Sequence, residues 1–395
     1  MLEQAKPVAG AGAMLSHPGL LMAGAAAFGM STLFSALKPV LLTRLMEETS
    51  WGAASAGVVV AAPFLGIALS SLLFFFRPPQ ASLRCLAVLF GGSLVLLELL
   101  SAFLFTDQLL LLALQFVAGF CVGALMSATS RLVAVSDAPD QSFGFIDMSA
   151  VALMSVMVAG AGAAVAAAGV TGGYGFAAVV SLVYALAIAS YRESPALLAH
   201  HDHMPEPLDI SLRPVAVVTM GVLFVTCSGL GFAFMFSLAA RLDLGYEEAG
   251  SRIGLLLLAS ALACQLGGWC SARFGPRYPL LAAFAACAVG WWMVVHAQSP
   301  TGFFLGLVPA VFALQFNFPI LLALSGSLDA HGRWAGIAAP LITSGFAWAA
   351  IVSGQVVQSR GLEALPEVTA LGMLLCAVLL WPATSVGTPA VNASS

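Results

Sequence analysis

The tetrapeptide ALQF occurs twice in the chain, at Ala113–Phe116 and at Ala313–Phe316. The copies are 313 − 113 = 200 residues apart in a chain of 395 residues, which is about half its length. Because Ala and Leu are common throughout this sequence, a four-residue match carries little weight alone. The match indicates an internal duplication only if the residues around it recur at a similar spacing.

Composition places both copies in a membrane. Hydrophobic residues make up 61% of the sequence, charged residues make up 8%, and the mean hydropathy is +1.00. A soluble globular protein carries roughly 25% charged residues, so this chain cannot cover a water-facing surface. Apolar runs of about 20 residues are typical of transmembrane helices, and the shorter alternating segments of a β-barrel are missing from the sequence. The predicted fold class is therefore an all-α membrane protein.

Twelve apolar runs are long enough to be transmembrane helices, and ALQF lies in the fourth and the tenth. They cover residues 19–43, 52–76, 83–105, 108–132, 143–168, 174–191, 214–239, 250–272, 279–298, 301–324, 334–357 and 367–386. The one sizeable polar connection, Tyr191–Pro214, falls at the midpoint. We therefore expect a tail over residues 1–18, a six-helix half over 19–191, a central loop over 192–213, a second half over 214–386, and a tail over 387–395.

Lysine and arginine in the short loops predict the orientation, because such residues are enriched on the cytoplasmic side. With the N-terminus inside, nine fall on the cytoplasmic side: Lys6, Arg77, Arg84, Arg131, Arg192, Arg213, Arg273, Arg277 and Arg333. Four fall on the other side: Arg44, Arg241, Arg252 and Arg360. We therefore expect both termini, both tails and the central loop to be cytoplasmic.

Other short matches recur at nearly the same distance as ALQF. They are Arg44-Leu45 with Arg241-Leu242, Ala56-Gly57 with Ala249-Gly250, and Arg77 with Arg273, at offsets of 197, 193 and 196 residues. Each pair holds the same position in the two sets of six spans. Six spans followed by six more in the same orientation form a parallel repeat, which is an arrangement that transporters use.

The connection after span 8 reads Gly268-Trp-Cys-Ser-Ala272-Arg273-Phe-Gly275-Pro-Arg277. This segment resembles the G-x-x-x-D-R-x-G-R-R/K loop of the major facilitator superfamily, with Ala272 in place of the acidic residue. The resemblance implies a gating role for four residues: Gly268, Arg273, Gly275 and Arg277. The first copy, RPPQASLR after span 2, departs from the pattern, which puts a charge-relay gate at that loop in doubt.

Span 4 is also similar to a family pattern. It reads Gln115-Phe-Val-Ala-Gly119-Phe-Cys-Val-Gly123, where R-x-x-x-G-x-x-x-G is common in the family, and Gln115 replaces the arginine. The stretch Ser327–Pro340 is similar to the loop into span 11 of many bacterial members. The resemblance covers all twelve spans. It implies the major facilitator fold in a bacterial inner membrane, with spans 1, 4, 7 and 10 around a central cavity.

A charged residue within a span is a candidate for a functional role, since each costs at least about 2.5–3.5 kcal/mol at the centre of the bilayer. Lys38 lies in span 1 beside Pro39. If Lys38 faces the central cavity, it can attract an anionic substrate. Alternatively, its long side chain extends to the lipid headgroups.

Two acidic residues are candidates for proton coupling or gating. Glu98 lies near the middle of span 3, and its alternative role is a neutral or hydrogen-bonded group in helix packing. Asp147 lies near the inner end of span 5, where it can pair with Arg131 or Arg77. Its alternative role is an acid that interacts with a helix dipole.

Amide and aromatic side chains are the remaining candidates for substrate contact. Amides can bind a carboxylate, hydroxyl or amide group without a fixed charge, or else join two helices by a hydrogen bond. Aromatic side chains can line an apolar cavity or face lipid. On the spans that the resemblance places at the cavity, and on span 11, the candidates are Gln115, Phe232, Gln315, Phe316, Asn317 and Trp348.

These features predict a secondary active transporter that moves a small organic solute by alternating access, coupled to protons. A lysine in the cavity favours an organic anion, and the aromatic residues suit an aromatic one. The alternative is drug or metabolite efflux by proton antiport, which a weakly polar aromatic lining favours. The sequence has no G-x-x-x-x-G-K-[ST] motif and no recognisable nucleophile–base pair, so neither ATP-driven transport nor an enzyme is expected.

The expected partners are the substrate, protons and the lipid bilayer, and the expected functional unit is a monomer. We expect no nucleic acid, no cofactor and no metal. The seven cysteines are scattered through apolar spans, and the cluster of His200, His201 and His203 lies in the central loop. A receptor or assembly factor without transport activity is a third possible class, which a flux assay would separate from a transporter.

Overall fold

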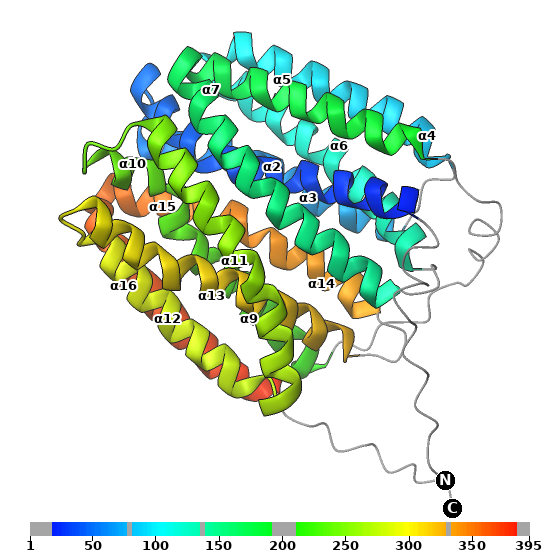
Figure 1. Cartoon of the computed structure of the whole chain (residues 1–395), viewed down its shortest axis with the longest axis vertical. Coiled ribbons are helices and arrows are strands. Elements are labelled where there is room, and N and C mark those ends of the chain that lie inside the picture. Colours follow the sequence, from blue (N-terminus) through cyan, green and yellow to red (C-terminus); the bar gives the residue numbers. More distant parts are fainter. Residues whose placement is uncertain (1–17, 77–80, 135–138, 192–210, 329–332, 385–395) are drawn as a thin grey trace, which may run out of the picture.

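The computed structural model describes residues 18–76, 81–134, 139–191, 211–328 and 333–384, and the regular elements within these ranges are all helices (Figure 1). The first seven elements are α2 (Pro18–Glu48), α3 (Ala53–Phe76), α4 (Leu83–Leu86), η1 (Ala87–Gly91), α5 (Gly92–Leu104), α6 (Gln108–Ala134) and α7 (Pro139–Ser190). The next five are α9 (Leu212–Ala233), α10 (Met235–Ala240), α11 (Tyr246–Phe274), α12 (Arg277–Val295) and α13 (Pro300–Gly326). The last four are α14 (Arg333–Thr343), α15 (Gly345–Arg360), η2 (Leu362–Ala364) and α16 (Leu365–Ala383).

The described helices give twelve transmembrane segments. Eleven helical stretches are long and apolar enough to span a membrane, and one of them, within α7, is 46 residues long. The backbone of α7 leaves the helical conformation at Ala168 and at Gly169, where φ is +60°. Gly169 tolerates this angle because it has no Cβ. The two arms of α7 correspond to the predicted spans 143–168 and 174–191.

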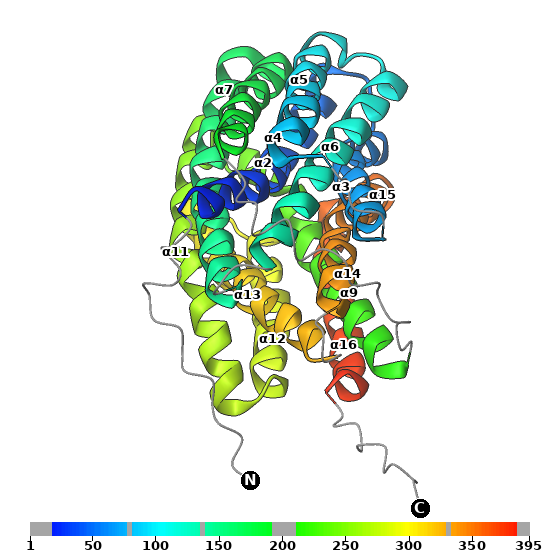
Figure 2. The same cartoon turned by 90° about the vertical axis from the view of Figure 1, so that its right-hand side faces the viewer.

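Helix contacts in the first six spans recur in the last six. The pairs α2–α7, α3–α6 and α5–α7 correspond to α9–α15, α11–α13 and α12–α16. Two further pairs, α3–α15 and α7–α11, join the two sets and lie on opposite sides of the bundle in Figure 2. This pairing is that of two parallel six-helix repeats, and the predicted fold class is confirmed. We call spans 1–6 the first repeat and spans 7–12 the second repeat.

The two ALQF segments hold equivalent places in these repeats. In α6, the carbonyl oxygen of Phe116 lies against Gly66 of α3, where a Cβ atom would overlap it. In α13, the carbonyl oxygen of Phe316 lies against Gly267 of α11 in the same way. Small residues let two membrane helices approach to backbone contact, which is a main source of their packing energy. The short sequence match therefore reflects a duplicated helix–helix contact.

The predicted division of the chain is only partly covered by the described residues. Helix α7 ends at Ser190 and α9 begins at Leu212, close to the expected limits of the central loop. Most of that loop, including its three histidines, lies outside the described residues, as do residues 1–17 and the tail over 387–395. The division into two halves at this loop stays a proposal.

Candidate functional site

Lys38 lies inside the bundle, ten residues before the end of α2, and its side chain is 2% exposed. Its Nζ atom is 5.2 Å from the ring centroid of Phe64, 5.8 Å from that of Phe232 and 4.8 Å from that of Phe346. Nζ also donates a hydrogen bond of 3.4 Å to the carbonyl oxygen of Phe346. We call these three phenylalanines the Lys38 cage. The ammonium group turns into the protein and not toward the headgroups.

The Lys38 cage is built from both repeats. Lys38 and Phe64 come from α2 and α3, whereas Phe232 and Phe346 come from α9 and α15. Phe232 was predicted as a substrate contact, but Phe64 and Phe346 were not. Nothing in the sequence distinguishes them among its 26 phenylalanines. Their role depends on the α3–α15 contact, which joins residues far apart in the chain.

The charge of Lys38 has no carboxylate partner among the described residues, whose ion pairs all involve arginine. A desolvated cation–π contact contributes about 2 kcal/mol, so the three rings offset part of the several kcal/mol that a buried unpaired charge costs. The aromatic faces and one carbonyl group provide partial negative charge only. The site therefore holds a buried amine, and an anionic ligand can neutralise its protonated form.

Glu98 and Gln115 form a second buried polar group, within the first repeat. Gln115 Nε2 donates hydrogen bonds of 3.0 Å to Ser101 Oγ and 3.4 Å to Glu98 Oε2. The other carboxyl oxygen of Glu98 is buried without a partner among the described residues. Tyr174 of α7 is also buried and lies near enough to interact electrostatically with Glu98. The structure therefore links Gln115 to α5 by an interhelical hydrogen bond.

The second-repeat candidates on α13 have fewer partners. Asn317 is 0% exposed, and both polar atoms of its amide lack a partner among the described residues. Gln315 is 9% exposed and Phe316 is half-buried beside α11. Among the described residues, Lys38 Nζ donates its hydrogen bond to Phe346 and not to either amide of α13.

Three other candidates, Trp348, Asp147 and Arg131, are not among the described contacts of Lys38 Nζ. Trp348 of α15 is 47% exposed. Asp147 is half-buried near Cys264 of α11, and no ion pair joins it to Arg131 within the described ranges. Arg77, the other predicted partner of Asp147, lies outside those ranges.

The connection after span 8, which resembles the family pattern, makes several local contacts. Gly275 ends α11 with φ of +74°, a conformation that favours glycine. Arg273 is exposed beside Trp269 and Phe274. Arg277 binds the end of α16 through Thr384, with its Nε 2.6 Å from the hydroxyl oxygen and its Nη2 3.2 Å from the carbonyl oxygen. A Cβ added at Gly268 would meet open space. A gating role for these four residues stays a proposal.

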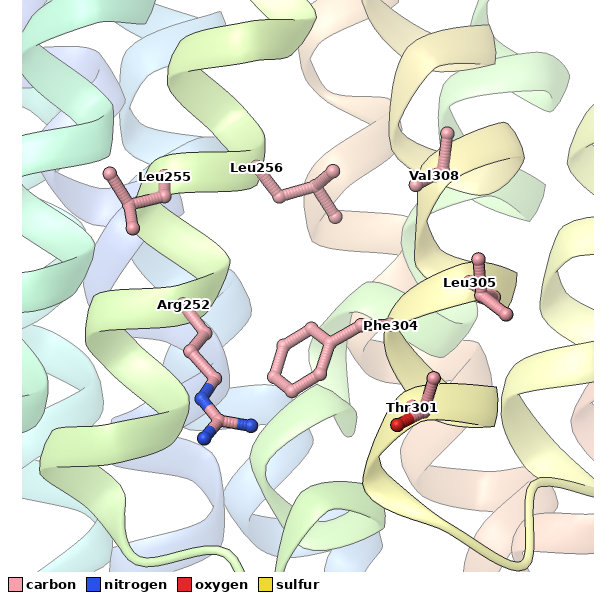
Figure 3. Close-up of a pocket in the computed structure, with 7 residues that line it drawn as sticks. All are labelled: Arg252, Leu255, Leu256, Thr301, Phe304, Leu305 and Val308. Carbon is pink, nitrogen blue, oxygen red and sulfur yellow. The ribbon is translucent and has the colours of Figure 1, made fainter.

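A surface groove between α11 and α13 provides a contrast with the Lys38 cage (Figure 3). It has a volume of about 530 Å³, and Arg252 points toward the ring of Phe304, 5.6 Å from its centroid. Unlike Lys38, Arg252 is half-exposed and already paired with Glu248, at 2.6 Å. None of the predicted site residues lines this groove.

Comparisons with solved structures identify the fold. A crystal structure of the D323A mutant of the nucleoside transporter NupG matches with a TM-score of 0.71 and 13% identity, covering 93% of this chain and 100% of that one. The D-xylose-proton symporter matches with a TM-score of 0.71 and 14% identity, covering 92% and 96%. A bacterial homolog of the human lysosomal transporter Spinster matches with a TM-score of 0.68 and 14% identity, covering 92% and 94%.

A search of curated proteins finds no match. The family model of the Major Facilitator Superfamily matches residues 20–354, which is most of the chain. The match confirms the resemblance seen in the loop after span 8 and in span 4. The family and the fold neighbours indicate a transporter and not an enzyme. The chain therefore belongs to the major facilitator superfamily and is a multi-pass membrane protein of the secondary-transport class.

Proposed function

We propose that this protein is a proton-coupled transporter of a small organic anion and that Lys38 pairs with the carboxylate of the substrate. The observation that carries the proposal is the buried amine of Lys38, which has no carboxylate partner among the described residues and is surrounded by residues of both repeats. A site between two repeats is where alternating access requires the substrate to bind. The amides of Gln315 and Asn317 are further candidates for substrate contact.

The cage phenylalanines favour an anion with an apolar, aromatic body. Phe64, Phe232 and Phe346 offer ring surfaces next to the amine of Lys38. Aromatic pairs contribute about 0.5–1.5 kcal/mol beyond the area that they bury, so a ring beside the carboxylate would add affinity. The proposed substrate class is therefore an aromatic monocarboxylate.

Glu98 is the proposed proton site. It is buried, one carboxyl oxygen lacks a partner among the described residues, and the other accepts a bond from Gln115. Ionisable residues within membrane helices often serve as proton relays. The fold neighbour that is a D-xylose-proton symporter supports proton coupling by analogy only, since the two chains are 14% identical. Asp147 is the second candidate.

The proposed membrane is the bacterial inner membrane, with both termini cytoplasmic.

Proton flux in proteoliposomes tests the proposed function. Wild type, Lys38→Met and the control Arg241→Met would be challenged with aromatic and aliphatic carboxylates and with cationic drugs. Lys38→Met removes the charge and keeps a similar length, whereas Arg241 is 45% exposed. We expect carboxylate-driven proton flux in wild type and Arg241→Met, and none in Lys38→Met. Carboxylate flux that persists in Lys38→Met contradicts the proposal.

Drug or metabolite efflux by proton antiport is the second candidate function. The observation that favours it is the Lys38 cage itself, because aromatic surfaces accept many apolar solutes. Proton flux that responds to cationic drugs alone, with the same rate in wild type and Lys38→Met, would replace the anion proposal with this one.

A further inference from the structure

Residues of both repeats meet where α2 ends and α11 begins, which we call the Glu48 end of the bundle. Tyr246 Oη donates a hydrogen bond of 2.8 Å to Glu47 Oε1. Arg44 Nη1 lies 2.8 Å from Glu47 Oε2, and its guanidinium carbon lies 5.7 Å from the ring centroid of Tyr246. Arg44 and Glu47 belong to the first repeat and Tyr246 to the second. These three side chains therefore link the two repeats at one end.

The same end of α2 also contacts α7 at the break in that helix. The carboxylate oxygens of Glu48 accept bonds of 3.3 and 3.4 Å from the backbone N–H of Val170. Arg44 Nε lies 2.6 Å from Glu48 Oε1. The Glu48 carboxylate occupies the place that a Cβ of Gly169 would take. Arg44 thus connects the break between spans 5 and 6 to the contact with α11.

Two more hydrogen bonds cross between the repeats near the Glu48 end. The hydroxyl groups of Thr43 and Ser237 share a hydrogen bond of 2.8 Å, which joins α2 to α10. The backbone N–H of Ala54 donates a bond of 2.9 Å to Oε1 of Gln358, which joins α3 to α15. Thr43 is 4% exposed, so the helices are closed around it. The Glu48 end of the bundle is therefore shut in this structure.

We propose that Arg44, Glu47 and Tyr246 form a latch that keeps the Glu48 end shut and opens in each transport cycle. Alternating access requires each end of the protein to open in turn, so the latch rests on the proposed function in that respect. The side chains of Arg44 and Glu47 are 32% and 42% exposed, and such ion pairs are weak. A weak ion pair suits a gate that must open in each transport cycle, because the pair breaks readily. With the orientation expected from the arginine distribution, this gate faces the outside of the cell.

The test measures how readily a reporter cysteine behind the latch reacts. Thr43→Cys would be labelled with a maleimide in lipid nanodiscs, and the labelling of the same protein without this change would be subtracted. Tyr246→Phe removes the hydroxyl group that binds Glu47 but keeps the ring, which stacks on Phe236 with a centroid distance of 5.9 Å. Tyr278→Phe is the matched control, since Tyr278 is 75% exposed and lies on α12.

We expect Tyr246→Phe to raise the labelling rate of Thr43→Cys roughly threefold to tenfold, because the open state gains population when the hydrogen bond is lost. Tyr278→Phe should leave the rate unchanged. Glu47→Ala removes the same bond from the other side and should act like Tyr246→Phe, so one misfolded variant does not spoil the test. An unchanged rate in the folded latch variants, or an equal rise in Tyr278→Phe, overturns the latch. No substrate is needed, so this result is independent of the anion proposal.

Discussion

The two copies of the ALQF segment pack alike but lie in different polar surroundings. Around α6, Gln115 donates hydrogen bonds to Ser101 and Glu98. On α13, the amide of Asn317 has no partner among the described residues, although it is fully buried. The repeats thus share the backbone contact that assembles the fold and differ in their polar side chains. We expect packing residues to have equivalent effects in both repeats and polar residues to have different ones.

The largest expected effect concerns the shared backbone contact. Gly66→Ala and Gly267→Ala should each lower the free energy of unfolding by about 3 kcal/mol, because the new Cβ overlaps a carbonyl oxygen of the neighbouring helix. The matched control is Gly268→Ala, one residue along α11, where a Cβ meets open space. Denaturant unfolding in detergent measures all three. If Gly267→Ala is as stable as Gly268→Ala, the backbone contact between α11 and α13 is not essential. The two repeats would then differ in their packing, which contradicts the prediction.

The next largest effect concerns the glutamines of the two ALQF segments, Gln115 and Gln315, whose replacement should change the free energy of unfolding by different amounts. Gln115→Leu should lower the free energy of unfolding by about 2 kcal/mol, since it leaves the buried carboxyl group of Glu98 without its amide donor. Gln315→Leu is the control, and we expect less than about 0.5 kcal/mol because no described residue bonds to its amide. The same unfolding assay measures both. Equal losses would show that the polar surroundings do not differ as described.

The smallest expected change in the free energy of unfolding is an increase. Asn317→Leu should raise the free energy of unfolding by about 1 kcal/mol, because it removes two buried polar atoms without partners and keeps a similar volume. If the amide also binds substrate, transport should fall in the same variant, as residues kept for function often reduce stability. A destabilised Asn317→Leu protein would mean that the amide does have a partner in the folded state.

Much of the fold follows from the sequence. The low charge content, the apolar runs and the repeated matches at offsets of 193 to 200 residues predict twelve spans in two parallel repeats. Such features are local, or they recur along the chain. The exact ends of the helices are less predictable: α2, for example, continues to Glu48, whereas the predicted span ends at residue 43. Polar residues at the end of a membrane helix remain helical beyond the apolar run.

The candidate site is less predictable because it depends on contacts between distant residues. Lys38 stands out in the sequence as the one lysine within an apolar span. Phe64 and Phe346 are 346 − 64 = 282 residues apart and meet beside Lys38 only because α3 packs against α15. The same holds for the latch, whose Glu47 and Tyr246 are 199 residues apart. Composition and spacing do not encode these pairings.

Ligand binding tests the central claim, that Lys38 pairs with the carboxylate of an anionic substrate. Isothermal titration calorimetry would compare an aromatic carboxylate with its carboxamide, for wild type and Lys38→Met. The two ligands have the same ring and differ in charge. We expect wild type to bind the carboxylate roughly tenfold or more tightly than the carboxamide, and Lys38→Met to show no such preference. A carboxylate preference that persists in Lys38→Met, or is missing from wild type, would contradict the claim.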